Sequence, residues 1–322
     1  MRKIIDDERL IYQCCSLYYE EHMGQSQIAK HLGISKSSVS RMLQTGRELE
    51  IVEIKVRHLA QYMYEDLEEE LKKKYHLKDV VVAESSPLDS KTERISKLNE
   101  RAADYLNRLL KDGDYVGVSV GSSIRNLAKT SHEAFHRNCT FVPLVGGISQ
   151  HTTGMEEVQS NQVAEALAEK YGGNYVSFFS PAVFSNENLM NEFLKEEAVR
   201  FIFDYFEKLD IVISGMNIAS SMYETVKKLG YVSDDQLDRF KKNGAVCNLI
   251  LRFLDQNGNT EPFDEYNRKI AGISAEAYKN VEHKLLITGG AGNAAAVKSC
   301  IRGNFANILI MDVDWAKALL VD

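Results

Sequence analysis

The most constraining feature of this sequence is an alternation of short apolar segments with amphipathic helical segments from residue 79 onward. In the helical segments apolar residues recur at three- and four-residue steps, as do Ile95, Leu98, Ala102, Leu106 and Leu109. Strands that alternate with helices in this way form a mainly parallel sheet. We therefore predict a Rossmann-like α/β domain with strands over 80–82, 115–120, 140–145, 175–178, 210–214, 246–251, 284–288 and 308–311.

Several of these strands are followed by loops rich in Gly and Ser. Small molecules bind to parallel sheets beyond the carboxyl ends of the strands, where the backbone N–H groups of helix N-termini can hold anions. A sugar or sugar phosphate needs many donors and acceptors of this kind. The loops therefore predict an effector site at Gly121, Ser122, Ser123, Gly146, Gly147, Gly289, Gly290 and Asn293.

The first sixty residues predict a helix-turn-helix, with helical periodicity from Arg9 broken at Gly24. Ser26 is suited to cap a short second helix, and Gly33 to end it in a left-handed conformation. Ser35 is suited to cap a third helix, with Val39, Met42 and Leu43 facing inward and the close helix crossing at Ala29. A plain solvated helical hairpin is the alternative. The segment 51–56 alternates like a strand and could form a wing.

The charge distribution favours DNA binding by this region, although the whole chain has a net charge of −7. No acidic residue lies between His22 and Arg47, so a phosphate backbone meets a locally positive surface. By their positions, Ser37, Ser38 and Arg41 are expected to contact base edges. Contacts to phosphates are expected from Gln25, Gln27, Lys36 and Arg47.

Between the two regions, apolar residues at four-residue spacing predict an amphipathic helix. Such a helix could mediate self-association, which paired DNA half-sites favour, or simply pack on its own domain. We expect a DNA-binding domain over 1–58, a linker over 59–78 and an effector domain over 79–322. Five scattered cysteines, no leader-like segment and no long apolar run predict a cytoplasmic protein with reduced thiols.

Motifs along nearly the whole chain resemble those of the SorC family of sugar-responsive bacterial regulators. They include QSQIAKHLGISKSSVSRML at 25–43, DYVGVSVGSS at 114–123, VPLVGGIS at 142–149 and DIVISG at 210–215. The resemblance implies oligomers and effectors that are usually phosphorylated sugars. It also implies an effector domain similar to the ribose-5-phosphate isomerase and glucosamine-6-phosphate deaminase fold, without catalysis.

The same resemblance implies roles for individual residues. The loop at 121–123 would hold a phosphate, the loop at 146–147 would line the pocket and Asn161 would touch the sugar. Arg252 and Asp255 occupy the segment that would help to close the site.

Three positions depart from the family pattern: Asn248 replaces an acidic residue, Asn293 replaces a lysine and Val145 replaces a lysine that forms a Schiff base in one relative. Loss of the lysine at 293 removes a charge-assisted bond of about 1.5–3 kcal/mol. The effector is then less anionic than usual, or its phosphate rests on backbone N–H groups and Arg252.

Two motifs suggest enzymes. HEAFH at 132–136 matches a helical zinc-protease motif, but a strand is expected to begin directly after it. GAGNAA at 290–295 resembles a dinucleotide fingerprint with Asp312 beyond it, yet only one strand and one helix remain after it.

These observations favour a DNA-binding transcription regulator, a repressor of a carbohydrate-utilisation operon, over an NAD-dependent oxidoreductase or a sugar-phosphate isomerase-like enzyme. We expect no catalytic residues, metal or cofactor. The expected partners are double-stranded operator DNA, a sugar or sugar phosphate, and further copies of the chain as a homodimer or homotetramer.

Overall fold

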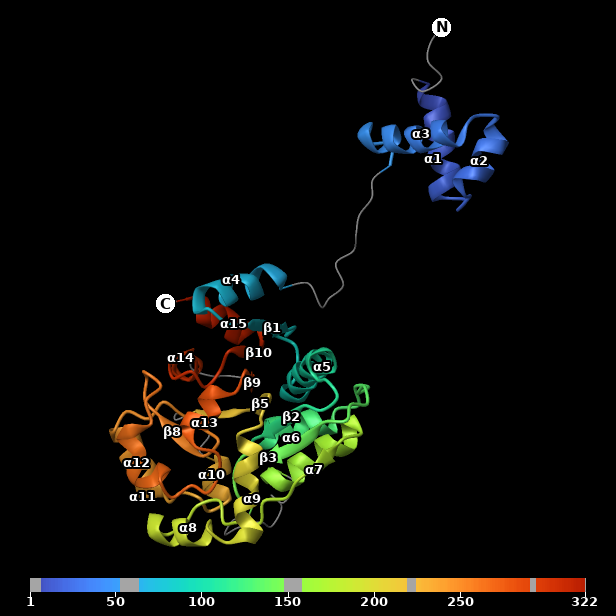
Figure 1. Ribbon diagram of the computed structural model, residues 1–322. Helices are drawn as coiled ribbons and strands as arrows, with labels where there is room; N and C mark the ends of the chain where they lie inside the picture. The colour runs from blue at the N-terminus through green and yellow to red at the C-terminus, as the bar shows by residue number, and fades with distance from the viewer. Residues whose placement is uncertain (1–6, 53–63, 148–157, 219–223, 290–293, 322) are drawn as a thin grey trace. The chain divides into compact units, whose positions relative to one another are not determined.

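The computed structural model describes residues 7–52, 64–147, 158–218, 224–289 and 294–321. The chain divides into two compact units, Met1–Leu59 and Ala60–Asp322 (Figure 1). The helix that contains Leu71 and was expected in a separate linker belongs to the second unit.

The N-terminal unit contains α1 (Glu8–Tyr19), α2 (Gln25–Leu32) and α3 (Lys36–Glu48). Gly33 ends α2 with a φ of 66°, and Ser35 caps α3 by accepting a hydrogen bond from the Ser38 N–H at 3.1 Å, as predicted. The prediction that Ser26 caps α2 is wrong. Gly24 is the N-cap, and the Gln27 side chain accepts a hydrogen bond from the Gly24 N–H at 2.9 Å, which satisfies that donor without a serine.

The core of this unit is formed by Ile11, Cys14, Cys15, Leu17, Ile28, Val39, Met42 and Leu43. Ala29, where the close helix crossing was expected, is half-buried. A close crossing occurs at buried Gly46, where a Cβ atom would collide with Cys15 Sγ. Of the strand predicted over 51–56, only Ile51 and Val52 lie within the described residues. They form a bend and pack against the helical core.

The C-terminal unit is built on a seven-stranded parallel sheet in the order β1-β10-β9-β5-β2-β3-β4. Its strands are β1 (Asp79–Ala83), β2 (Tyr115–Val118), β3 (Thr140–Pro143), β4 (Asn174–Tyr175), β5 (Ile211–Ser214), β9 (His283–Thr288) and β10 (Ile308–Asp312). The prediction of a mainly parallel α/β domain is confirmed.

A second sheet, antiparallel and three-stranded, consists of β6 (Met216–Ile218), β7 (Cys247–Leu249) and β8 (Arg252–Leu254). The strand predicted over 246–251 is β7, so it pairs outside the parallel sheet. We did not predict β6 or β8, because three-residue strands are too short to show an alternating pattern.

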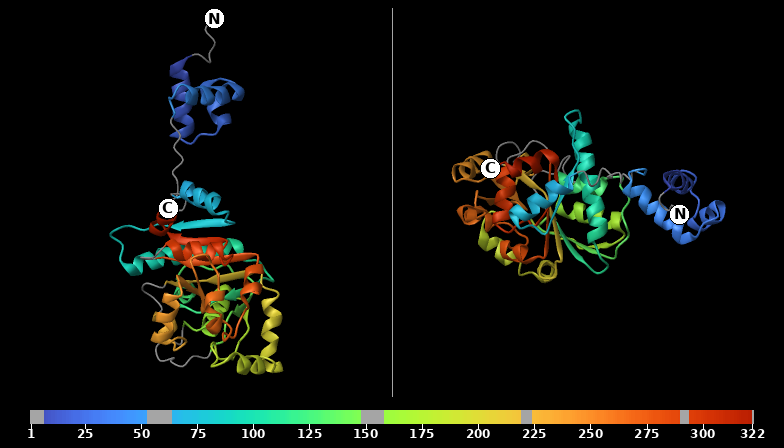
Figure 2. Two further views of the ribbon diagram at one scale, coloured as in Figure 1. Left: turned by 90° about the vertical axis from the view of Figure 1, so that its left-hand side faces the viewer. Right: turned by 90° about the horizontal axis from the view of Figure 1, so that it is seen from above.

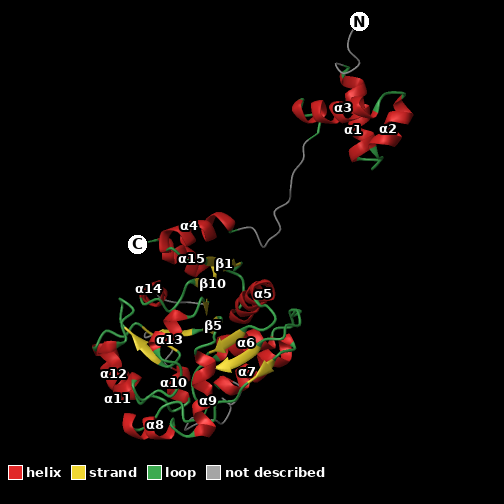
Figure 3. Cartoon of the chain, in the orientation of Figure 1, coloured by secondary structure: helices red, strands yellow, loops and turns green. Residues whose placement is uncertain are grey.

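Helices cover both faces of the large sheet, as the strands and helices of Figure 3 show. One face is covered by α5 (Lys91–Leu109), α6 (Ser122–Lys129) and α7 (Ser160–Tyr171). The other face is covered by α4 (Glu65–Tyr75), α9 (Glu197–Phe206), α13 (Ala275–Asn280), α14 (Ala294–Arg302) and α15 (Val313–Leu320). In the right-hand view of Figure 2 the green and the red helices lie on opposite sides of the strands.

Shorter elements complete the unit: α8 (Glu187–Phe193), α10 (Glu224–Lys228), α11 (Asp234–Lys242), η4 (Glu261–Phe263) and α12 (Asp264–Asn267). A third apolar cluster lies among α11, β8, η4 and α12, where Phe240, Phe253 and Phe263 pack together. This cluster also includes Val145, and Val120 packs against it. It therefore reaches the carboxyl ends of β2 and β3.

Candidate functional site

The exposed face of α3 carries the side chains that we predicted to read DNA. Lys36, Ser37 and Arg41 are exposed, whereas Ser38 is half-buried. The Ser35 hydroxyl lies 2.8 Å from the hydroxyls of both Ser37 and Ser38, so these three groups form a small cluster at the start of the helix. Ser38 contributes both its N–H and its hydroxyl to this cluster, which leaves it the least free to meet a base.

The residues predicted to contact phosphates lie around this face. Lys36 and Arg47 are exposed near the two ends of α3, and Gln25 is half-buried in the first turn of α2. Gln27 is exposed, but its side-chain oxygen is already bonded to the Gly24 N–H. Its NH₂ group is the part that could reach a phosphate oxygen.

In the C-terminal unit, β2 is the point at which the strand order reverses. The chain passes from β2 to β3 and β4 on one side, and later adds β5, β9 and β10 on the other. Ligands of open parallel sheets bind at this switch point, beyond the carboxyl ends of the strands. Here the ends of β2 and β5 are joined by a hydrogen bond of 3.4 Å from the Gly215 N–H to the hydroxyl of fully buried Ser119.

The loop that leaves β2 is shaped by Gly121, which is the N-cap of α6 and has a φ of 136° and a ψ of 160°. Only glycine adopts this backbone conformation at low cost. The Gly121 N–H donates to Val158 O at 2.9 Å, but no side chain caps the first turn of α6. Ser122 is exposed and Ser123 half-buried at this turn. Among the described residues, no capping side chain accepts from the N–H groups of this turn.

The neighbouring loop, after β3, is held by tight backbone packing. A Cβ atom on Gly146 would lie 2.5 Å from Ser180 O, so no side chain fits there. Gly147 lies directly against the Asn161 amide. Asn161 is buried, accepts from the Phe178 N–H at 2.8 Å and donates to Phe178 O at 3.2 Å. A direct contact of Asn161 with a sugar would be left to the second hydrogen of its amide nitrogen.

Asn248 in β7 has an unfilled hydrogen-bonding group. The residue is 1% exposed, and no described residue bonds to its Nδ2. Strand register places Asn217 of β6, Asn248 and Phe253 on one face of the small sheet. Phe253 belongs to the cluster that reaches Val120 and Val145, so this face is turned toward the rim of the large sheet. The sequence places Asn217 at this rim, because it follows the fifth predicted strand. We did not predict Ser119 as a site residue, because only the pairing of β2 with β5 places it there.

Arg252 and Asp255 are both engaged in structural contacts. The buried Arg252 guanidinium donates to Asn267 O at 3.1 Å and to Ile273 O at 2.7 Å, and its Nε has no described partner. Burial lowers the pKa of Arg252 to about 10. The Asp255 carboxylate accepts from the N–H groups of Asn257 and Asn259 in its own turn, each at 2.8 Å. Of the two supports considered for a phosphate, the backbone N–H groups of α6 are thus more available than Arg252.

The last predicted loop is only partly described. Gly289 is exposed, and a Cβ atom on it would lie 3.3 Å from Asp312 Oδ2. Gly290 and Asn293 lie outside the described residues. Asp312, considered as a ribose contact of a dinucleotide site, is buried and caps α15 by accepting from the Trp315 N–H at 3.0 Å.

The zinc motif at 132–136 lies in a loop, not on a helix. His132 is 2.8 Å from Asp104, whereas His136 packs against Gly172. The two histidines therefore lack the helical spacing that directs both at one metal ion. In the described parts of the chain, no three His, Cys, Asp or Glu side chains gather as a metal site.

Comparison with known proteins identifies both units. A family model described as "Putative sugar-binding domain" matches residues 62–321, and the IclR helix-turn-helix model matches residues 19–53. The sorbitol operon regulator of Klebsiella pneumoniae is 28% identical over 319 residues, covering 98% of each chain. The deoxyribonucleoside regulator of Bacillus subtilis is 28% identical over 322 residues, covering 98% of this chain and 99% of the relative.

Solved structures agree with these matches. The full-length sorbitol operon regulator SorC from Klebsiella pneumoniae superposes with a TM-score of 0.70 at 26% identity, covering 98% of this chain and 99% of SorC. A transcriptional regulator from Streptococcus pneumoniae has a TM-score of 0.71 at 25% identity, covering 79% of this chain and 96% of the other. The chain belongs to the SorC family of sugar-binding transcription regulators.

Membership of the SorC family decides between a sugar-binding domain and an enzyme as the explanation of the Gly-rich loops. The SorC-family relatives are named as regulators, so the chain is a transcription regulator with a DNA-binding helix-turn-helix and a sugar-binding domain, and the enzyme alternatives are not favoured. In its described residues this SorC-family chain has no helix with the length and apolar character of a membrane span.

Proposed function

We propose that this SorC-family chain represses a carbohydrate-utilisation operon and is released from its operator by a sugar or sugar phosphate. The DNA contacts in this proposal come from α3: Ser37 and Arg41 read base edges, with Ser38 as a minor contributor. Lys36, Arg47, Gln25 and the free NH₂ group of Gln27 hold phosphates. These roles are supported by the exposure of Gln27, Lys36, Ser37, Arg41 and Arg47, whereas Gln25 and Ser38 are half-buried.

The effector site in this proposal lies at the carboxyl ends of β2, β3, β5 and β9. The observation that carries it is the N-terminus of α6, which starts at the topological switch point and has no capping side chain from the part of the chain that the structure describes. A phosphate there accepts hydrogen bonds from the backbone N–H groups and from the hydroxyls of Ser122 and Ser123. Gly146 and Gly147 allow close approach of the ligand, and Gly289 adds the loop that follows β9. Gly290 and Asn293, which lie outside the described residues, belong to the same proposal on the strength of the sequence alone.

The remaining polar groups orient the sugar. Asn248 offers a buried amide donor that a bound ligand would satisfy, and such unfilled groups are costly when they stay unpaired. Asn161 and Arg252 hold the main chain around the site through Phe178, Asn267 and Ile273. Asp255 keeps the turn after β8 in shape. Val145, where a Schiff-base lysine would stand, is buried in the apolar cluster, so capture of the sugar rests on hydrogen bonds.

The test is thermal unfolding of the full chain with pentose, hexose and hexitol phosphates, the same compounds without phosphate, inorganic phosphate and NAD⁺. Binding at 100 times the dissociation constant stabilises the folded state by about 2.7 kcal/mol. We expect a shift with at least one sugar phosphate that the Gly121→Ala variant loses. Gly113→Ala is the matched control, because Gly113 also has a positive φ (93°) but precedes β2 at the opposite end of the strand.

A shift with NAD⁺ alone would contradict the proposal and favour a dehydrogenase. Equal shifts of the thermal midpoint with free sugars and with their phosphates would exclude a phosphate site at α6, and the proposed sugar site would stand. Equal losses in the Gly121→Ala and Gly113→Ala variants would show that backbone strain, not the site, explains the effect.

A further inference from the structure

Asn248 contains a buried donor that no described residue satisfies. The residue is 1% exposed, and its Nδ2 atom has two hydrogens without an acceptor in the part of the chain that the structure describes. Native proteins leave few buried polar groups unpaired, because such a group loses its bonds to water and gains none in return. The amide lies on the face of the small sheet that is turned toward the rim of the large sheet, since Asn248 pairs with Phe253. A molecule that reaches Asn248 is therefore expected to bring an acceptor atom.

The side-chain oxygens of Ser119 and Asn161, at the same rim, are already in use. The Ser119 hydroxyl accepts from the Gly215 N–H at 3.4 Å and donates to a main-chain carbonyl at 3.3 Å. The Asn161 oxygen accepts from the Phe178 N–H at 2.8 Å. What remains for a ligand is a set of donors. They are the first-turn N–H groups of α6, which no described side chain caps, and the free amide hydrogens of Asn161 and Asn248.

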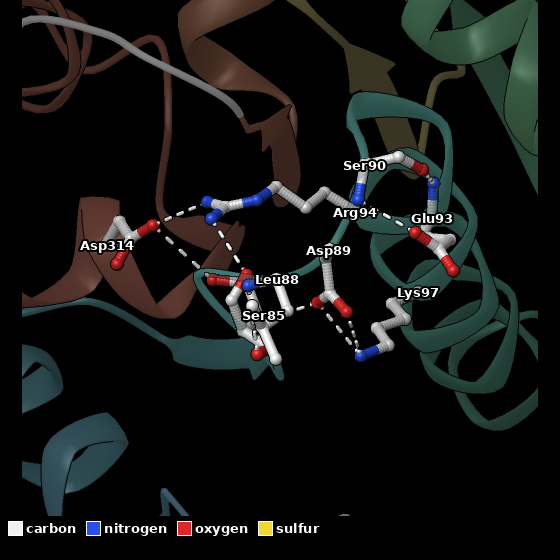
Figure 4. Close-up of polar contacts among 9 residues, drawn as sticks. Ser85, Leu88, Asp89, Ser90, Glu93, Arg94, Lys97 and Asp314 are labelled. Atoms are coloured by element: carbon white, nitrogen blue, oxygen red, sulfur yellow. Dashed lines mark hydrogen bonds and ion pairs between the residues drawn. The ribbon is translucent and has the colours of Figure 1, made fainter.

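Three cations of this unit are held by other groups of the protein. Arg94 Nη1 lies 2.6 Å from Asp314 Oδ2, and Lys97 Nζ lies 2.9 Å from Asp89 Oδ2, both at the β1 end of the rim (Figure 4). The Arg252 guanidinium donates to two main-chain carbonyls, at 3.1 Å and 2.7 Å. A carboxylate bound beside the unpaired amide would lose its hydration and gain no partner from these cations. The acceptor is therefore expected to be neutral.

We propose that Asn248 donates to a carbonyl oxygen, so that the effector of the proposed site is a sugar phosphate whose carbonyl group is not closed in a ring. This inference rests on the proposed function and adds the chemical class of the sugar. A carbonyl oxygen offers two lone pairs and brings no hydrogen of its own. A hydroxyl oxygen also accepts, but its hydrogen would be buried among donors. Asn217, the neighbour of Asn248 across the small sheet, is half-buried, so water can satisfy its amide and the selection depends on Asn248.

The experiment is isothermal titration calorimetry of the full chain with pairs of probes that differ in one oxygen. Ribulose-5-phosphate cannot close a furanose ring, because the oxygen needed for closure carries the phosphate, so its carbonyl stays open. Ribitol-5-phosphate has a hydroxyl in place of this carbonyl, and ribonate-5-phosphate carries a carboxylate instead. Fructose-6-phosphate and glucitol-6-phosphate form a longer pair, in which ring closure makes the measured preference a lower limit. In the pair that binds, we expect the carbonyl compound to have an affinity at least about fivefold higher.

Asn248→Asp tests which end of the amide meets the ligand. A protonated carboxyl group donates as the amide does, whereas an ionised one only accepts. Because burial favours the protonated form, the variant should bind the carbonyl probe nearly as well as the wild type at about pH 6.5 and at least about tenfold more weakly at about pH 9. The wild type, titrated at the same pH values, corrects for ionisation of the phosphate. The probe pairs need only the wild type, so the test does not depend on the folding of this variant.

Asn107→Asp is the matched control, because it also places an acid at a buried asparagine. Asn107 lies in α5, where its amide bonds to Glu133 O and to the Phe135 N–H in the segment that leads to β3. This variant should keep the pH dependence of the wild type. Asn248→Ala lacks the donor and should bind about twofold to tenfold more weakly at every pH.

Equal affinities for the carbonyl and hydroxyl probes would overturn the proposal and leave the proposed function intact. The same holds for tighter binding of ribonate-5-phosphate, or for an Asn248→Asp variant that binds better as the pH rises. If the wild type binds no sugar phosphate at all, the proposed function fails together with this inference.

Discussion

Gly46 lies where the first and third helices of the DNA-binding unit cross, beneath the thiol of Cys15. Both Cys14 and Cys15 are buried, and burial raises the pKa of Cys14 to about 11. A thiol with so high a pKa remains protonated at neutral pH and behaves as a small apolar group. These residues therefore fix the distance between α1 and α3.

Gly46→Ala should destabilise the unit by about 1–3 kcal/mol, because the new methyl group overpacks the crossing. Cys15→Ala creates room at the same place, so the double variant should recover part of the loss. Chemical unfolding of the wild type, both single variants and the double variant measures this coupling. An equal cost of Gly46→Ala with and without Cys15 would show that the thiol does not limit the approach of the helices.

Among the elements, α4 places the charged side chain of Glu68 against the edge strand β1, and the partial burial of this charge costs free energy. Glu68 is half-buried, and its carboxylate accepts the Val82 N–H and lies 3.9 Å from Arg101. Burial raises the pKa of Glu68, with the Val82 hydrogen bond opposing the shift. A pKa raised by folding means that the folded state holds this proton more tightly. Protonated Glu68 contributes its whole share to the free energy of unfolding at pH values below its pKa in the unfolded chain. This contribution is lost as the pH rises through the pKa of Glu68 in the folded state.

Glu68→Gln should therefore raise the thermal midpoint at pH 7, because the amide keeps an acceptor for Val82 without a buried charge. The gain should shrink as the pH is lowered toward the carboxyl range, where the wild-type side chain is also neutral. Calorimetry across this range measures the trend, with Glu70→Gln as control on the exposed face of α4. A gain that does not depend on pH would exclude the titration of Glu68 as its source.

The elements that the sequence predicted well are those with enough residues to show a pattern. The strands that became β1, β5, β9 and β10 lie in continuous apolar runs, and the capping of α3 by Ser35 follows from local chemistry. The small sheet could not be predicted in the same way, since its pairing joins segments that are distant in sequence.

The Gly-rich loops at the ends of the strands were predictable for a similar reason, because tight turns require glycine wherever they occur. The partners of Asn161 and Arg252 were not, as they are main-chain groups 15 or more residues away. Side-chain roles in such a site depend on tertiary contacts that no local pattern reports.

At the scale of the whole molecule, the chain is acidic, whereas its helix-turn-helix unit has a central stretch without acidic residues. The net charge of −7 keeps most of the surface unattractive to nucleic acid, while residues 23–46 contain no Asp or Glu. Binding to DNA should therefore be local to α2 and α3 and should depend strongly on salt.

Arg41→Ala should lower the affinity for an operator selected from a double-stranded library by about fivefold to 150-fold, since a bidentate base contact is worth ~1–3 kcal/mol. Lys36→Ala should weaken all sequences alike and reduce the salt slope by about 0.9. Fluorescence anisotropy over a salt series measures both. Arg268→Ala, which removes an exposed arginine from the C-terminal unit, is the control and should change neither quantity.

Helix α15 connects the loop after β9 with helix α4. Its N-cap, Asp312, lies against Gly289 at the rim, and its last turn is held by α4, where Tyr75 donates to Leu319 O at 2.7 Å and Lys74 to Leu320 O at 3.0 Å. Eight residues span only about 12 Å. A genetic screen for constitutive or uninducible alleles should thus recover substitutions in α15, in residues that touch neither ligand.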